Sequence, residues 1–234
     1  MSVKEKYVKA ARIIIKAGIL PFPLTDTLLE ILYMLLEEDD LDFIMAFKRK
    51  FSQTIEQLKK SSKLPEEEIL KMIEKLASKG VVFNQPNSQG VMVIRLLPLM
   101  MVGPFEYIFM RKVNHTEEEK KLAKLFKTLF NEAKDLIHEK YDMFLPVFQK
   151  LPPIDRTVPI LQKTKSGQEV QISVNETVEV PEEKILITQD IKELINKFDD
   201  IAVGFCFCRQ HEDLLGNPYK ETDLRENCQG RIPA

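Results

Sequence analysis

The chain has 234 residues, of which 44% are hydrophobic and 30% are charged, and its formal net charge at neutral pH is −2. This mixture is typical of a globular protein and excludes a disordered tail. Proteins that wrap nucleic acid carry an excess of basic residues, and this chain has none overall. At this length we expect more than one structural part.

The start of the chain and its cysteine content indicate the compartment. Lysines and Arg12 interrupt the first apolar residues, so we expect no signal peptide. The longest apolar stretch, Leu96 to Gly103, contains Pro98 and falls short of the roughly 20 residues that cross a bilayer. An odd number of cysteines, 3, is typical of a reducing compartment. We therefore expect a cytoplasmic protein with no membrane segment.

Apolar spacing predicts three helices near the N-terminus. The first spans residues 3–17, where apolar residues recur at helical spacing between lysines. Thr25 or Asp26 can cap a second helix. We expect the acidic run from Glu37 to Asp40 to close that helix, and a third short helix to cover Leu41 to Lys48.

The next segment carries the clearest architectural pattern. Residues 52–58 and 64–76 are predicted to form a helix, a turn and a second helix, with Pro65 at the first helical position and Gly80 as the stop. Residues 81–83 and 91–97 then predict a β-hairpin around a polar turn. Three helices followed by such a hairpin indicate a winged helix, which we expect to extend to about Pro98.

The remaining chain predicts a connector and a second small domain. Residues 99–152 are predicted to be a helical connector. Within it Thr116 and Glu119 form a capping-box pattern, which predicts a long helix from Thr116 to Tyr141. A proline-punctuated linker is predicted from Leu145 to Pro159. Residues 153–234 are predicted to form a small mixed α/β region, with two strands in 158–180 and a helix at 188–198. The fold class expected from the sequence is therefore α+β.

The three cysteines cluster near the C-terminus. Cys206 and Cys208 are separated by one residue, and Cys228 follows nineteen residues after Arg209. Adjacent thiolates of this spacing are poorly placed for a mutual disulfide but can converge on one metal centre. Arg209 could offset their negative charge or donate hydrogen bonds to sulfur. The alternative is three buried structural thiols.

A family resemblance adds to this interpretation. The run Gly204-Phe-Cys-Phe-Cys-Arg, then Leu214-Leu-Gly-Asn-Pro and Glu226-Asn-Cys, resembles a motif of prokaryotic ferredoxin-type proteins. Segments similar to residues 97–107 and 153–159 also occur in that family, after a winged-helix region. The resemblance implies binding of a four-iron cluster and an electron-transfer role, with Cys206, Cys208 and Cys228 as ligands.

The chain departs from the family pattern at two places. Tyr219 stands where the family has a further cysteine, and the chain ends at Ala234 without the family's ferredoxin domain, so we expect a truncated or degenerate member. Three thiolates could hold a three-iron cluster or a four-iron cluster with one open iron. His211 is the nearest candidate for a fourth ligand, including that of a Cys3His zinc site, although an exposed histidine without a metal role is the commoner case.

The second class of function is a metal- or redox-responsive regulator that binds DNA. Six lysines form a locally basic region around the predicted helix-turn-helix: Lys59, Lys60, Lys63, Lys71, Lys75 and Lys79. Three glutamates begin the second helix, however, and residues 1–100 hold fifteen Lys and Arg against thirteen Asp and Glu, so DNA binding is not favoured. No hydrolase or nucleotide-binding motif is present. We expect an electron-transfer or accessory protein with a redox partner, which could pair as a homodimer to supply missing ligands.

Overall fold

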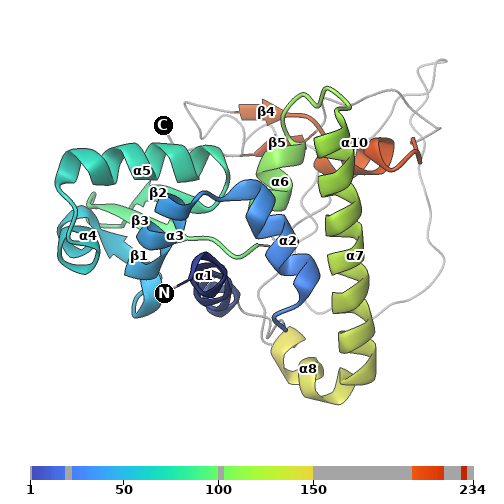
Figure 1. Ribbon diagram of the computed structural model, residues 1–234, viewed down its shortest axis with the longest axis horizontal. Helices are drawn as coiled ribbons and strands as arrows, with labels where there is room; N and C mark the ends of the chain where they lie inside the picture. The colour runs from blue at the N-terminus through green and yellow to red at the C-terminus, as the bar shows by residue number, and fades with distance from the viewer. Residues whose placement is uncertain (1, 19–22, 100–102, 150–201, 219–227, 231–234) are drawn as a thin grey trace, which may run out of the picture.

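The computed structural model describes residues 2–18, 23–99, 103–149, 202–218 and 228–230 (Figure 1). The fold is mixed α+β and mostly helical, with a three-stranded antiparallel sheet and a separate two-stranded sheet. None of the helices in these ranges is both long enough and apolar enough to cross a membrane.

The first two helices lie where apolar spacing predicts them. Helix α1 spans Val3–Ala17, and Ser2 and Glu5 form a reciprocal capping box at its start. Helix α2 spans Asp26–Leu35, and the Thr25 hydroxyl accepts a hydrogen bond from the Leu28 N–H at 3.2 Å. Both predictions are confirmed.

The acidic run after α2 starts a helix and does not close one. Helix α3 spans Glu38–Met45, with Glu37 as its N-cap, and the Asp40 carboxylate accepts a hydrogen bond from the Glu37 N–H at 3.0 Å. Carboxylates at this end complement the positive pole of the helix. The prediction that Glu37 to Asp40 ends the second helix is therefore wrong.

The middle of the chain builds the three-stranded sheet. The elements in order are η1 (Ala46–Lys48), β1 (Ser52–Thr54), α4 (Ile55–Ser62), α5 (Glu66–Ser78), β2 (Val82–Pro86) and β3 (Met92–Leu96). The sheet order is β1-β3-β2, with Gln53 and Asn84 both opposite Ile94. Strand β1 was predicted as the start of a helix, but pairing with the distant β3 makes it extended. The predicted hairpin and the helix at α5 are confirmed.

The next elements of the described chain are helices. They are α6 (Pro104–Phe109), α7 (Glu117–Glu139) and α8 (Tyr141–Phe148). The capping box of Thr116 and Glu119 begins α7 as predicted. The predicted linker from Leu145 is wrong in its first residues, because α8 continues to Phe148 with Pro146 inside it.

The C-terminal part contains β4 (Ala202–Gly204), α10 (Phe207–Leu214) and β5 (Cys228–Gly230). Strands β4 and β5 pair antiparallel. Helix α10 was not predicted from the sequence. The strands predicted in 158–180 and the helix predicted at 188–198 lie outside the described residues.

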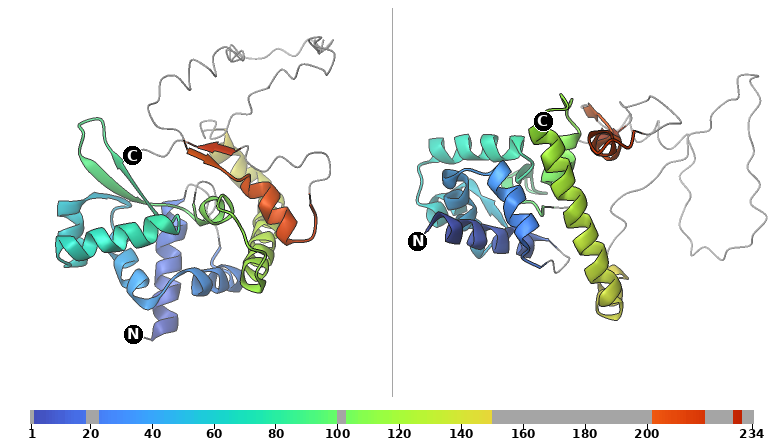
Figure 2. Two further views of the ribbon diagram at one scale, coloured as in Figure 1. Left: turned by 90° about the horizontal axis from the view of Figure 1, so that it is seen from above. Right: turned by 45° about the vertical axis from the view of Figure 1, so that its right-hand side comes forward.

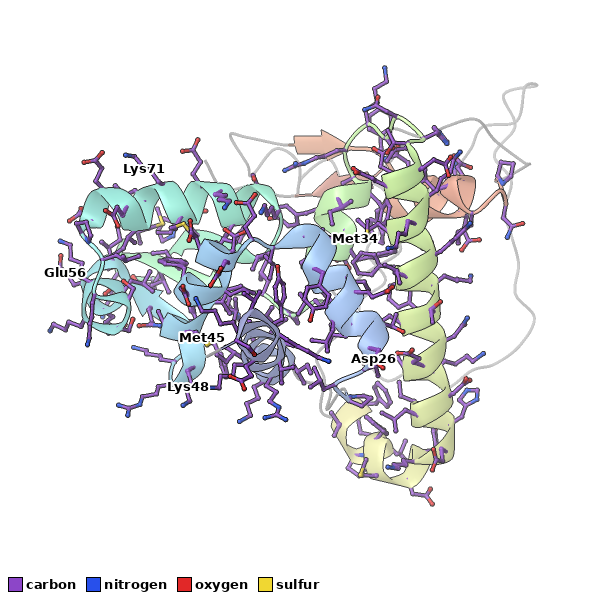
Figure 3. The ribbon with its side chains drawn as sticks, in the orientation of Figure 1. Asp26, Met34, Met45, Lys48, Glu56 and Lys71 are labelled. Atoms are coloured by element: carbon purple, nitrogen blue, oxygen red, sulfur yellow. The ribbon has the colours of Figure 1, made fainter. Side chains whose placement is uncertain are left out.

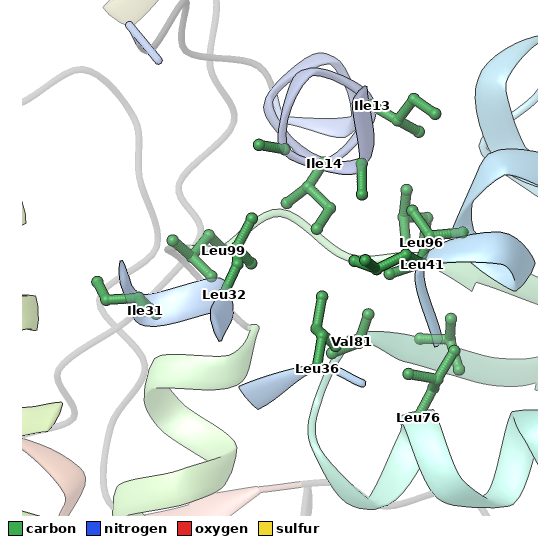
Figure 4. Packing of buried hydrophobic residues seen from close by; sticks show 14 of the residues in the cluster. Ile13, Ile14, Ile31, Leu32, Leu36, Leu41, Leu76, Val81, Leu96 and Leu99 are labelled. Atoms are coloured by element: carbon green, nitrogen blue, oxygen red, sulfur yellow. The ribbon is translucent and has the colours of Figure 1, made fainter. Parts of the chain in front are cut away.

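One buried cluster joins the N-terminal helices and the three-stranded sheet to α6, α7 and α10. Figure 4 shows Ile14 of α1 near Leu32 and Leu99, while Leu36, Val81 and Leu76 pack below them. The same cluster continues through Phe105, Phe109, Leu122 and Phe126 of α6 and α7, and it includes Leu214 of α10. The Thr27 hydroxyl also donates a hydrogen bond to Glu132 at 2.6 Å, which ties α2 to α7. The predicted connector thus packs into the same core as the N-terminal helices.

Candidate cysteine site

Helix α10, which Cys206 precedes and Cys208 lies within, docks on α6 and α7 through one face. Phe207, Gln210, His211 and Leu214 follow the spacing i, i+3, i+4, i+7. Gln210, His211 and Leu214 are buried, and Phe207 packs partly buried against the core. Figure 2 shows α10 lying alongside α6 and α7. This inward face fixes the orientation of the helix.

Two of the cysteines lie at the start of α10. Cys206 is the N-cap residue, and Cys208 is the second residue of the helix. Cys206 is half-buried, Cys208 is exposed, and Arg209 is half-buried. The first turn of a helix directs backbone N–H groups outward and carries partial positive charge, so it favours a negatively charged group. A thiolate or a thiolate-bound metal cluster is such a group.

Strand pairing brings the third cysteine to the same place. In the β4–β5 pair, Cys228 is the register partner of Gly204, two residues before Cys206. The backbone of Cys228 therefore lies beside the segment that leads into the first two cysteines. The side chain of Cys228 lies outside the described part of the chain. Sequence spacing alone did not indicate this pairing.

The strand that leads into the site packs closely on the segment after α6. The Phe205 N–H donates a hydrogen bond to the Met110 carbonyl oxygen at 3.0 Å. A Cβ added at Gly204 would lie 2.9 Å from the Met110 Cε atom, so a larger residue would displace that side chain. Glycine at position 204 thus allows β4 to approach this segment.

Gln210 anchors α10 to the same segment. Its amide side chain is only 5% exposed. The Nε2 group donates hydrogen bonds to the carbonyl oxygens of Arg111, at 2.6 Å, and of Phe109. The Oε1 atom accepts one from the Val113 N–H at 3.3 Å. All three contacts are to backbone groups at the end of α6 and in the segment after it, which would otherwise need other partners.

His211 belongs to the core and is not exposed. Its side chain is 4% exposed and lies among the aromatic rings of Phe105, Phe109 and Phe130. The Nε2 atom lies 2.9 Å from the Ala123 carbonyl oxygen, which requires Nε2 to be the donor. The expectation of an exposed histidine is therefore wrong. Its place in the α10 spacing was the signal that could have shown this.

The environment of His211 disfavours its charged form. Burial lowers the pKa of His211 below its ordinary value of 6.5, against the opposing effects of the Ala123 carbonyl and Glu212. Lys127, which pairs with Glu212 at 3.1 Å, adds to the lowering. The imidazole is thus neutral at neutral pH, and its Nε2 donates a hydrogen bond to the Ala123 carbonyl of α7.

The lysines around α4 and α5 mostly face carboxylates. Lys59 pairs with Glu56 and Glu66, and Lys71 pairs with Glu67. Lys75 and Lys79 both pair with Asp40. In Figure 3 the Lys71 and Glu56 side chains project outward from α5 and α4. Four of the six lysines of the predicted basic region are thus matched by acids, which weakens the case for phosphate binding.

No metal cluster is complete within the described side chains. Among them, no group of three or more His, Cys, Asp or Glu residues is arranged to hold an ion, and the Cys228 side chain is not in that set. Comparisons of this chain with protein-family models, with curated proteins and with solved structures find no match.

Proposed function

We propose that residues 38–96 form a winged helix. The order helix, strand, helix, helix, strand, strand, with the sheet order β1-β3-β2, supports this assignment. In it α4 and α5 are the helix-turn-helix and the β2–β3 hairpin is the wing. Two further helices, α1 and α2, precede this unit.

We propose that Cys206, Cys208 and Cys228 hold an iron–sulfur cluster and that the protein has an electron-transfer or redox-associated role. The observation that carries the proposal is the pairing of Cys228 with Gly204, beside the first turn of α10. Thiolates are the usual ligands of such clusters, and a bound cluster would supply a one-electron carrier. Arg209, on the same turn, would offset the negative charge.

The donor set suits a centre with fewer than four cysteines. His211 is buried and its Nε2 contacts the Ala123 carbonyl, so it is a poor fourth ligand. Three thiolates fit a three-iron cluster or a four-iron cluster completed by water, by a partner or by a second copy of the chain. A redox partner protein is the expected acceptor or donor of electrons. A zinc site on the same thiolates is the alternative centre.

A redox-responsive regulator that binds DNA is the second candidate. The proposed winged helix favours it, because this arrangement presents a helix to the major groove in many regulators. The ion pairs of Lys59, Lys71, Lys75 and Lys79 argue against it, because those cations already have acidic partners. Fold alone does not decide between the two.

Metal analysis of the full chain tests the proposal. Protein purified without oxygen should contain iron and matching sulfide, with visible absorption and paramagnetic resonance spectra of a cluster. Each of Cys206→Ser, Cys208→Ser and Cys228→Ser should lose iron. The control Ser61→Ala, in α4 and distant in sequence from the cysteines, should keep it. Zinc without sulfide would support the alternative centre. A colourless, metal-free protein that is folded by circular dichroism would overturn the proposal.

A further inference from the structure

Helix α5 ends in a cap that depends on glycine. The Gly80 N–H donates to the Ala77 carbonyl and the Val81 N–H to the Leu76 carbonyl, both at 2.9 Å. This pair of bonds is a Schellman motif, and Gly80 has the left-handed φ of 69° that the motif requires. The cap sets where α5 stops and where β2 begins.

Two contacts from a neighbouring segment meet at this cap. The Arg111 guanidinium donates a hydrogen bond to the Ser78 carbonyl, in the last turn of α5. The Tyr107 side chain covers Gly80 so closely that a Cβ there would lie 2.6 Å from the Tyr107 Cβ. Both contacts come from α6 and the residues just after it.

Helix α10 holds that same segment from the other side. Gln210 binds the Phe109 and Arg111 carbonyls and the Val113 N–H, and the Phe205 N–H binds the Met110 carbonyl. The ring centroids of Phe207 and His211 also lie 5.7 and 5.2 Å from that of Phe105 in α6. Figures 1 and 2 show α6 between α5 and α10.

We propose that residues 107–113 couple the docking of α10 to the order of the C-terminal end of α5, so that loading of the cysteine site stabilises the α5 cap. The coupling to loading rests on the proposed function. A centre that tethers Cys206 and Cys208 to Cys228 would hold α10 in its docked position. Gln210 would then hold residues 109–113, and Arg111 would hold Ser78.

Residues 107–113 are suited to this role because other elements supply the hydrogen-bond donors for their backbone carbonyls. The carbonyls of Phe109 and Arg111 accept hydrogen bonds from Gln210 of α10, and the Met110 carbonyl accepts one from Phe205, between β4 and α10. If α10 undocks, these groups lose their partners, and the segment loses the contacts that fix the Arg111 backbone. Coupling of this kind is reciprocal, so a weaker α5 cap should also weaken loading of the site.

Hydrogen exchange on the full chain tests the coupling. Loading with iron and sulfide should slow exchange of the Gly80 and Val81 amides, whose bonds form the cap, by about fivefold, the equivalent of one hydrogen bond. Arg111→Gln should reduce that change to less than about twofold while iron content is kept. Lys112→Gln removes the same charge from the neighbouring exposed residue and should leave the wild-type change intact.

Each outcome bears on a separate statement. If iron binds but the Gly80 and Val81 amides exchange at the same rate, the coupling is overturned and the proposed function stands. If no metal binds, the proposed function fails, and metal-free Gln210→Met tests the coupling instead. Faster exchange of these two amides in that folded variant, with unchanged exchange in α1, supports the coupling. Unchanged exchange at Gly80 and Val81 overturns it.

Discussion

The Lys79 ammonium lies 2.8 Å from Oδ2 of Asp40, a carboxylate with no exposed surface. Lys75, one turn earlier in α5, lies 2.8 Å from Oδ1, and the Glu37 N–H donates to Oδ2 at 3.0 Å. Asp40 therefore joins the start of α3 to the last turns of α5. Burial alone would raise the pKa of Asp40, but the Glu37 N–H and the two ammonium groups together lower it below 3.8.

Replacing Asp40 with asparagine should destabilise the protein by about 2 kcal/mol at neutral pH, because two lysines lose their buried partner. Urea unfolding of wild type and Asp40→Asn measures this loss. The exposed neighbour Asp39→Asn is the control and should change the free energy of unfolding by less than about 0.5 kcal/mol. Because the folded pKa is lowered, the contribution is present above 3.8 and is lost as the pH falls through the folded value. A loss that persists in full at lower pH would contradict an ionic cause.

The helices with strong apolar spacing could be predicted from the sequence, and the short elements could not. Helices α1, α5 and α7 carry caps and continuous apolar stripes, so local residues suffice to define them. Strand β1 has three residues and exists because it pairs with β3, some 40 positions later in the chain. The prediction for the run from Glu37 to Asp40 is wrong because acidic residues stabilise the positive N-terminal end of a helix, here α3, and not the negative C-terminal end of the helix before it.

The candidate site divides in the same way. The clustering of Cys206, Cys208 and Cys228 is visible in the sequence, but the backbone pairing of Cys228 with Gly204 depends on long-range strand contacts. Gln210 and His211 stand among charged residues, so their burial was not evident from composition. Their spacing with Phe207 and Leu214 does indicate burial, because residues at i, i+3, i+4 and i+7 lie on one face of a helix.

His211 should make stability depend on pH near neutrality. Its folded pKa lies below 6.5, so the histidine is neutral in both states above that value. As the pH falls below 6.5 the unfolded chain binds the proton first, and stability decreases by up to about 1.4 kcal/mol per pH unit. Urea unfolding between about pH 7.5 and about pH 5.5 should show this slope in wild type and in His138→Gln, but a smaller one in His211→Gln. Equal slopes in all three proteins would show that other groups cause the dependence.

Two glycines with similar positive φ angles should respond differently to alanine. Gly80 has φ 69° and faces the Tyr107 side chain, whereas Gly90 has φ 75° and no atom within 4 Å of an added Cβ. Gly90→Ala should cost about 1 kcal/mol from backbone strain alone. Gly80→Ala adds a steric clash, so we expect a loss of about 3 kcal/mol in thermal or urea unfolding. Similar losses for both variants would mean that Tyr107 moves aside without cost.

Lys63 occupies a backbone position that favours glycine. It is the C-cap residue of α4, with a left-handed φ of 62° and ψ of 21°, and its N–H donates to the Lys59 carbonyl at 3.1 Å. Lys63→Gly should therefore stabilise the protein by about 0.5 to 1 kcal/mol in urea unfolding, because glycine adopts this conformation without strain.

Lys60→Gly removes the same charge from the interior of α4, so it is the matched control. There glycine should destabilise by about 1 kcal/mol, the ordinary cost in a helix interior. The opposite signs separate backbone conformation from charge, since both variants lose one cation of the region predicted to be basic. If both variants shift stability in the same direction, loss of the lysine charge outweighs the left-handed backbone at position 63.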